Sequence, residues 1–376
     1  MANAESDSSG PSCQKIQGEV MVSRWYTFAF VLVTVSLAGW GAGSSALQEA
    51  TTPLQKAVTP SGPNDGLPPK FLHGHDLKVR PGGEKDFTEK TPRIGVELYH
   101  DVARNVVIAI SEKGWIAAVP APVLGTDPQC KWLTAHDLHA RKADEKDFTS
   151  KTRKYGVEVF HDLALRHLLY VCESGSVALA PLPAGLVTDR GPKLLHGFSL
   201  AVRQPEQNDF ANAPRFGVEI FRDLNTPDGL LCIVGESGSI ATVAYSNPPA
   251  ASPSSTSVKD PQTLYGLILR VRTASEKTFS DSTRRYSVEV YADPNTATGH
   301  LLYMSQTGAL AVSVARKVDD TKRGVTWLGG MAVRARAAGE RSFAKARQYN
   351  IEVFRDNRSG NLLYICETGS IAVVSP

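Results

Sequence analysis

Apolar and polar residues alternate along short segments that recur through most of the chain. In the first copy, the segments His75 to Arg80 and Ile94 to Tyr99 alternate with a period of two over most of their length, which is typical of half-buried strands. Two apolar runs follow, Val106 to Ser111 and Trp115 to Val119, with Gly114 in the turn between them. Glycine suits this turn because tight hairpins demand positive φ. The pattern predicts four strands in each copy and no helix.

The copies share a strand motif in which a glutamate, an aromatic residue and an aspartate occupy alternate positions. The motifs begin at Glu97, Glu158, Glu219, Glu289 and Glu352, in steps of 61, 61, 70 and 63 residues. A period in this range marks a repeat architecture, in which each unit stacks on its neighbours to bury its apolar face. We predict β repeats at residues 70–122, 131–183, 193–246, 262–316 and 326–376.

The repeat count and the strand count together predict the fold. Four-stranded antiparallel sheets repeated around an axis form a β-propeller, which typically has about 4 to 8 blades. We therefore predict an all-β protein with five blades. The alternatives are a tandem array of small β-barrel-like modules, which the Pro/Ser-rich linker at 247–261 favours, and another β-solenoid. Against the array, units of about 52 ordered residues without disulfides are marginal alone. We see no strand exchanged between the chain ends, so ring closure would depend on side-chain packing.

The amino-terminal region has the pattern of an export signal. No residue from Trp25 to Gln48 is charged, Arg24 precedes this stretch, and small residues lead up to Ala46 as the cleavage point. We predict a signal peptide at 1–48, with Met1 or Met21 as the start, or alternatively an uncleaved membrane anchor. A flexible linker follows at 49–69. Either interpretation places the repeats in the periplasm, at the cell surface or in the medium.

Composition limits the classes of partner. Hydrophobic residues make up 42% of the chain and charged residues 21%, and the net charge is +3. Binding to nucleic acid usually needs a dense basic face, so we expect no nucleic-acid partner. We expect contact with a membrane only through an amino-terminal anchor, and the sequence leaves the oligomeric state open.

The cysteines do not form the pattern of a disulfide framework. Cys172 and Cys366 occupy one repeat position, Cys232 lies in a predicted strand and Cys130 in a linker. We interpret them as small apolar core residues. One disulfide among these four cysteines remains an alternative.

A small polar set recurs in all five copies and supplies the candidate site residues. It consists of an arginine at the end of the first strand, the motif glutamate and the motif aspartate. The residues are Arg80, Arg141, Arg203, Arg272 and Arg336; Glu97, Glu158, Glu219, Glu289 and Glu352; and Asp101, Asp162, Asp223, Asp293 and Asp356.

Their recurrence favours a structural role, because structural motifs recur in every unit of a repeat protein. Strand alternation predicts that Arg80 lies beside Glu97 in the same copy as an ion pair, and that Asp101 caps the following turn. A loop phenylalanine, Phe87 in the first copy, would pin its loop to the sheet.

The binding interpretation is that these groups line equivalent ligand sites. Recognition of sugars commonly combines aromatic faces with carboxylate and arginine groups. Trp132 and Trp327 supply such faces, whereas Phe71, Leu194 and Thr263 occupy their repeat position in the other copies. We predict an exported, non-catalytic binding or structural module with a glycan or cell-wall polymer as ligand. The alternatives are a protein–protein interaction scaffold and, third, a carbohydrate-active hydrolase.

No catalytic or metal signature stands out from the repeat. A hydrolase would need a carboxylate pair that one copy has and the others lack, and we find none. No nucleophile elbow, phosphate loop or zinc motif is present, so we expect no enzyme activity and no cofactor. His73 and His75 share a strand face, but the sequence offers no third ligand. We therefore predict no metal site and interpret these residues, with His136 and His139, as solvated surface histidines.

Overall fold

The computed structural model describes residues 68–188, 190–226, 229–244, 258–295, 299–314 and 318–375. The predicted signal or anchor, nearly all of the 49–69 linker and most of the 247–261 linker lie outside these residues. All secondary-structure elements in the described part of the chain are β-strands. These residues contain no helix that could cross a membrane.

The described residues form five four-stranded antiparallel sheets, each built from consecutive strands. Blade 1 contains β1 (Lys70–Lys78), β2 (Arg93–Asp101), β3 (Val106–Ser111) and β4 (Ile116–Pro120). Blade 2 contains β5 (Cys130–Ala140), β6 (Arg153–Asp162), β7 (His167–Cys172) and β8 (Val177–Pro181). Blade 3 contains β9 (Lys193–Ala201), β10 (Arg215–Asp223), β11 (Leu230–Gly235) and β12 (Ile240–Ala244). Blade 4 contains β13 (Gln262–Val271), β14 (Arg284–Asp293), β15 (His300–Ser305) and β16 (Leu310–Val314). Blade 5 contains β17 (Val325–Ala335), β18 (Arg347–Asp356), β19 (Leu362–Cys366) and β20 (Ile371–Val374).

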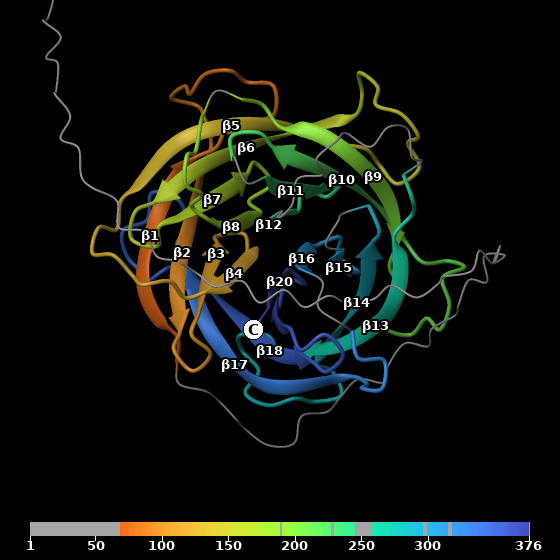
Figure 1. Cartoon of the computed structure of the whole chain (residues 1–376). Helices are drawn as coiled ribbons and strands as arrows, with labels where there is room; N and C mark the ends of the chain where they lie inside the picture. The colour runs from red at the N-terminus through yellow and green to blue at the C-terminus, as the bar shows by residue number, and fades with distance from the viewer. Residues whose placement is uncertain are drawn as a thin grey trace, which may run out of the picture. The chain divides into compact units, whose positions relative to one another are not determined.

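The five sheets stand in a ring (Figure 1). The last strand of each blade, from β4 to β20, lies at the centre, and the long first strands form the perimeter. Each central strand contacts the central strands of both neighbouring blades, including β20 with β4. The predicted five-bladed β-propeller is confirmed, and the tandem array is wrong.

The hydrophobic cores lie between blades rather than inside them. Each core cluster combines side chains from two adjacent blades; one joins Val79 and Leu98 of blade 1 to Phe160 and Leu169 of blade 2. The other four clusters lie between blades 2 and 3, 3 and 4, 4 and 5, and 5 and 1. A single blade therefore has no core of its own, which explains why the units are not independent modules.

The turn before each central strand contains the predicted glycine in the left-handed region. Its φ angle lies between 79° and 93° at Gly114, Gly175, Gly238, Gly308 and Gly369. A side chain is disfavoured at these φ values, so the hairpins depend on glycine.

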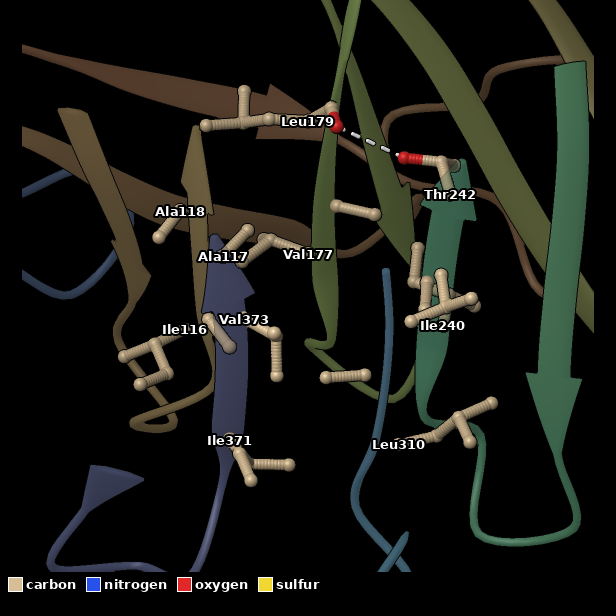
Figure 2. A pocket seen from close by; sticks show the side chains of 15 residues that line it. Ile116, Ala117, Ala118, Val177, Leu179, Ile240, Thr242, Leu310, Ile371 and Val373 are labelled. Atoms are coloured by element: carbon tan, nitrogen blue, oxygen red, sulfur yellow. Dashed lines mark hydrogen bonds between the residues drawn. The ribbon is translucent and has the colours of Figure 1, made fainter. Parts of the chain in front are cut away.

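The channel along the ring axis is lined by short apolar side chains of the central strands (Figure 2). The cavity there measures about 40 Å³ and is lined by alanine, valine, leucine and isoleucine with one threonine. The hydroxyl of Thr242 donates to the carbonyl oxygen of Leu179 at 2.9 Å. This volume is far below the roughly 300 to 1,000 Å³ of typical ligand pockets, so the channel is a poor site for a ligand.

Candidate functional site at the blade junctions

An ion pair at the same repeat position links each blade to the next, and we call it the arginine latch. The arginine follows the first strand of one blade, and the glutamate lies in the second strand of the next blade. Each pair is bidentate, from Nε to Oε1 and from Nη2 to Oε2. The Nε–Oε1 distances are 2.7 Å for Arg80–Glu158, 2.6 Å for Arg141–Glu219, 2.8 Å for Arg203–Glu289, 2.7 Å for Arg272–Glu352 and 2.6 Å for Arg336–Glu97. The last pair joins blade 5 to blade 1 and closes the ring.

The arginine–glutamate pair recurs as predicted, but the prediction that Arg80 pairs with Glu97 of its own copy is wrong. Arg80 lies two residues beyond β1 and reaches blade 2, while Glu97 receives Arg336 from blade 5. Gly74 pairs with Glu97 in the sheet, and a Cβ there would lie 1.9 Å from the Glu97 Oε2 and 2.7 Å from the Arg336 Nη2. The missing side chain of Gly74 therefore leaves the space that the neighbouring blade's arginine needs.

The loop phenylalanine stacks on the latch arginine of its own blade. The distances from the guanidinium carbon to the ring centroid are 4.5 Å for Phe87, 4.7 Å for Phe148, 4.4 Å for Phe210, 4.8 Å for Phe279 and 4.5 Å for Phe343. In each blade Nη1 also donates to a carbonyl oxygen five residues further along the chain. The phenylalanine thus holds the loop through the arginine, and all three guanidinium nitrogens are engaged by the protein itself.

In this arrangement the arginines and glutamates have a structural role, because they link adjacent blades. The hydrogen bond to Glu158 raises the pKa of Arg80 above its usual value, so the latch remains an ion pair. Bidentate, charge-assisted bonds of this kind are among the stronger polar contacts in proteins. These contacts already use three of the five N–H groups of each guanidinium and cover its face with phenylalanine, so the arginine latch is a poor ligand site.

A second contact, the aspartate latch, also repeats at every junction. The aspartate ends the second strand of a blade, is buried, and accepts hydrogen bonds through Oδ2 from histidine or tyrosine side chains of the preceding blade. The donors are His73 and His75 to Asp162, His136 and Tyr170 to Asp223, His196 to Asp293, Tyr265 and Tyr303 to Asp356, and Tyr364 to Asp101. These aspartates do not join the arginine and glutamate in one cluster, so the three candidate types serve two separate contacts.

The other carboxylate oxygen caps the following turn in four blades, as the sequence predicts for the aspartates. Oδ1 accepts from the backbone N–H of Leu165, Asn225, Asn295 and Arg358 at 2.9 to 3.0 Å. The first copy differs, because Asp101 binds the Arg104 side chain through Oδ2 at 2.9 Å instead. Asp101 therefore holds the following turn through the Arg104 side chain and not through a backbone N–H, as the other four aspartates do.

The histidines of the aspartate latch are not solvated surface groups, so that prediction is wrong for them. The side chain of His136 is fully buried, and those of His73 and His75 are 11% and 5% exposed. Burial alone would raise the pKa of Asp162, but hydrogen bonds from His73, His75 and the Leu165 backbone lower it well below its usual value. Asp162 is therefore a carboxylate at neutral pH.

The junction of blades 5 and 1 also contains an open cleft of about 500 Å³, which we call the aromatic cleft. Phe71 from β1, Tyr99 from β2 and Phe343 from the loop of blade 5 line it, with centroids 5.5 Å apart for Phe71–Tyr99 and 5.0 Å for Phe71–Phe343. Arg334 and Gln348 of blade 5 add exposed polar side chains. The Tyr99 hydroxyl donates to the Arg334 carbonyl oxygen at 2.5 Å and accepts from its N–H at 3.1 Å, which fixes the base of the cleft.

Aromatic pairs occur at two other junctions, but there a tryptophan of the pair is hydrogen-bonded to the arginine latch. Phe87 contacts Trp132 at 5.8 Å and Phe279 contacts Trp327 at 5.6 Å between ring centroids. The indole N–H of each tryptophan donates to the latch glutamate at 2.7 and 2.8 Å, respectively. Trp132 is still 42% exposed.

The sequence did not single out Tyr99, Arg334 or Gln348 as site residues. Phe71 and Phe343 belong to the first and last copies and meet only because the ring closes. A search of the recurring aromatic positions, with the two end copies treated as neighbours, would have found this aromatic pair.

Cys130, Cys172, Cys232 and Cys366 are free thiols. Cys172, Cys232 and Cys366 are buried, and burial raises the pKa of Cys172 to about 11 and of Cys366 to about 11. A buried thiol with so high a pKa is inert as a nucleophile. The interpretation as apolar core cysteines is confirmed for these three, and the alternative of a disulfide among the four is wrong.

No protein-family model, curated protein or solved structure matches this chain. The assignment of a site therefore depends on the geometry alone.

Proposed function

We propose that the protein is an exported, non-catalytic binding module whose ligand is a glycan or a cell-wall polymer, held in the aromatic cleft. The observation that carries the proposal is the cleft itself, which is lined by aromatic side chains and measures about 500 Å³. This volume falls within the usual size range of ligand pockets. Phe71 is 39% exposed. A sugar ring has an apolar C–H face that can pack on such a surface, while its hydroxyls bind polar groups at the edge.

The polar groups of the cleft suit hydroxyl recognition. Arg334 and Gln348 are exposed and line the cleft together with the aromatic residues, and Arg334 Nη1 also donates to the Phe343 carbonyl oxygen at 3.3 Å. Arg334 supplies hydrogen-bond donors and Gln348 supplies both a donor and an acceptor. The central channel is much smaller, at about 40 Å³, and its lining side chains are apolar apart from Thr242, so the cleft is the better candidate.

A non-catalytic role agrees with the residues that line the cleft. They include no carboxylate, histidine, cysteine or serine, which are the common general acids, bases and nucleophiles. Burial raises the pKa of Tyr99, and its hydroxyl is held by the Arg334 backbone. Export is proposed from the amino-terminal sequence alone.

We expect the purified protein to bind at least one polysaccharide or cell-wall preparation in a glycan array and pull-down, and Phe71→Ala to weaken that binding about tenfold, or roughly 1.4 kcal/mol. Leu194→Ala is the matched control, because Leu194 occupies the same repeat position in blade 3 and is 37% exposed. This control should leave affinity unchanged.

Two results would count against the proposal. If the wild-type protein retains no glycan or polymer, the protein–protein scaffold becomes the better account, and cross-linking in the native envelope would then identify the partner. Equal affinities of the Phe71→Ala variant and the wild-type protein would place the ligand elsewhere on the ring.

A further inference from the structure

The junction of blades 1 and 2 differs from the other four in its aspartate latch. Two histidines of β1 and one aspartate at the end of β6 converge there, and their ligand-type atoms all lie within 4.8 Å of one another. His73 and His75 are two residues apart, so strand alternation places them on the same face, directed at blade 2. The third group, Asp162, comes from the next copy, 87 residues beyond His75.

The geometry is already close to that of a metal centre. The Nε2 atoms of His73 and His75 lie 2.8 and 2.9 Å from the same Oδ2 atom of Asp162, and their ring centroids are 5.0 Å apart. Ligands of a tetrahedral zinc ion with bonds of about 2.0 to 2.1 Å lie roughly 3.3 Å apart. Each Nε2–Oδ2 distance therefore needs to lengthen by only about half an ångström, and the two Nε2 atoms, which lie within 4.8 Å of one another, must reach the same spacing.

The chemistry of the three groups selects a class of metal. Two imidazoles and one carboxylate suit Zn²⁺ and neighbouring first-row transition metals, whereas Mg²⁺ and Ca²⁺ prefer oxygen ligands alone. The carboxylate is held in place, because its Oδ1 accepts the Leu165 N–H at 2.9 Å. Such a supporting hydrogen bond is a common feature around metal ligands.

A purely structural latch does not need the second imidazole. The junction of blades 3 and 4 makes its histidine contact with His196 alone, and the junction of blades 2 and 3 uses His136 with Tyr170. Thr134 stands in blade 2 at the position that His73 occupies in blade 1. Among the described residues, the blade 1–2 junction is the one place where three such ligands converge.

We propose that His73, His75 and Asp162 form a binding site for one divalent transition-metal ion, with Zn²⁺ preferred, that fastens blade 1 to blade 2. The ion replaces the two N–H···O hydrogen bonds and takes both imidazoles as neutral ligands through Nε2. A fourth tetrahedral position is left for water or an incoming donor group. The site is separate from the aromatic cleft, so this proposal does not depend on glycan binding.

The test is Zn²⁺ binding by the full chain without an affinity tag, after treatment with chelator and dialysis. We expect one equivalent of Zn²⁺ per chain by elemental analysis and titration, and a visible Co²⁺ spectrum typical of tetrahedral nitrogen and oxygen ligands. His73→Thr introduces the residue that blade 2 carries at this position, and should weaken binding roughly 100-fold or more. Saturating Zn²⁺ should also raise the thermal midpoint of the wild-type protein but not that of this variant.

His196→Thr is the matched control, because His196 occupies the same repeat position in blade 3 and also binds the aspartate of the next blade, at 3.2 Å. It should retain one equivalent of Zn²⁺. His73→Gln keeps a hydrogen-bond donor for Asp162 and replaces His73→Thr if the threonine variant does not fold. The proposal is overturned if the wild-type protein binds less than a stoichiometric amount, if the folded His73 variant binds equally well, or if His196→Thr loses the ion as well.

Discussion

Replacing Glu289 with alanine is expected to lower the free energy of unfolding by about 3 to 5 kcal/mol. The Glu289 and Arg203 side chains are both fully buried, and they form the most enclosed arginine latch among the described residues. Removal of the carboxylate leaves the guanidinium charge of Arg203 buried without its counter-ion, and this penalty is much larger than the net strength of the pair. Urea unfolding followed by circular dichroism measures the change.

The same junction provides the control. Glu206 of blade 3 binds Arg285 of blade 4 at 2.5 Å, but the two side chains are 66% and 45% exposed. Glu206→Ala should therefore cost no more than about 1 kcal/mol. If both variants lose the same small amount of stability, the arginine latches do not hold the blades together.

Gly156→Ala is expected to destabilise the protein by about 3 kcal/mol, although alanine is the smallest possible addition. A Cβ at this position in β6 would lie 1.9 Å from the Arg80 carbonyl oxygen of blade 1. Because the obstacle is backbone rather than a flexible side chain, the two blades must move apart and the neighbouring arginine latch must distort. The loss should appear as a lower urea midpoint with an unchanged slope.

Ser287 is the matched control, because it occupies this position in blade 4, where the chain already accommodates a Cβ. Its hydroxyl is buried and makes no hydrogen bond. Ser287→Ala should therefore leave stability unchanged or raise it by up to about 1 kcal/mol. A neutral Gly156→Ala result would mean that the blades are not in close contact at this position.

Much of the fold is predictable because it depends on local patterns. Alternation in Ile94 to Tyr99 and the glycine turn at Gly114 specify strands and hairpins, and the spacing of the glutamates specifies how many blades exist. Partners across a junction are harder to predict. Strand alternation gives the face on which a side chain lies, but the partner on that face can belong to the same blade or to the next one. Arg80 shows this, because the sequence predicts that it pairs with a motif glutamate but not that this glutamate belongs to the next blade.

The candidate sites are likewise predictable within a copy but not across a junction between blades. The two histidines of β1 were noticed in the sequence, but their third ligand, Asp162, belongs to the following copy and approaches only after the blades stack. The aromatic cleft likewise combines residues from opposite ends of the repeat region. Repeats reveal which residues recur, whereas sites between repeats depend on how copies are packed against one another.

The central claim is that the first and last blades meet and close the ring, and a double-mutant cycle on Arg336 and Glu97 tests it most directly. These residues are 239 positions apart in the chain, yet their side chains form a bidentate pair. The Arg336 side chain is 21% exposed, so Arg336→Met and Glu97→Gln should both fold. A closed ring predicts a coupling energy of about 1 to 3 kcal/mol between the two substitutions. Effects that add within about 0.5 kcal/mol would show that the two blades do not touch, and would contradict the closed propeller.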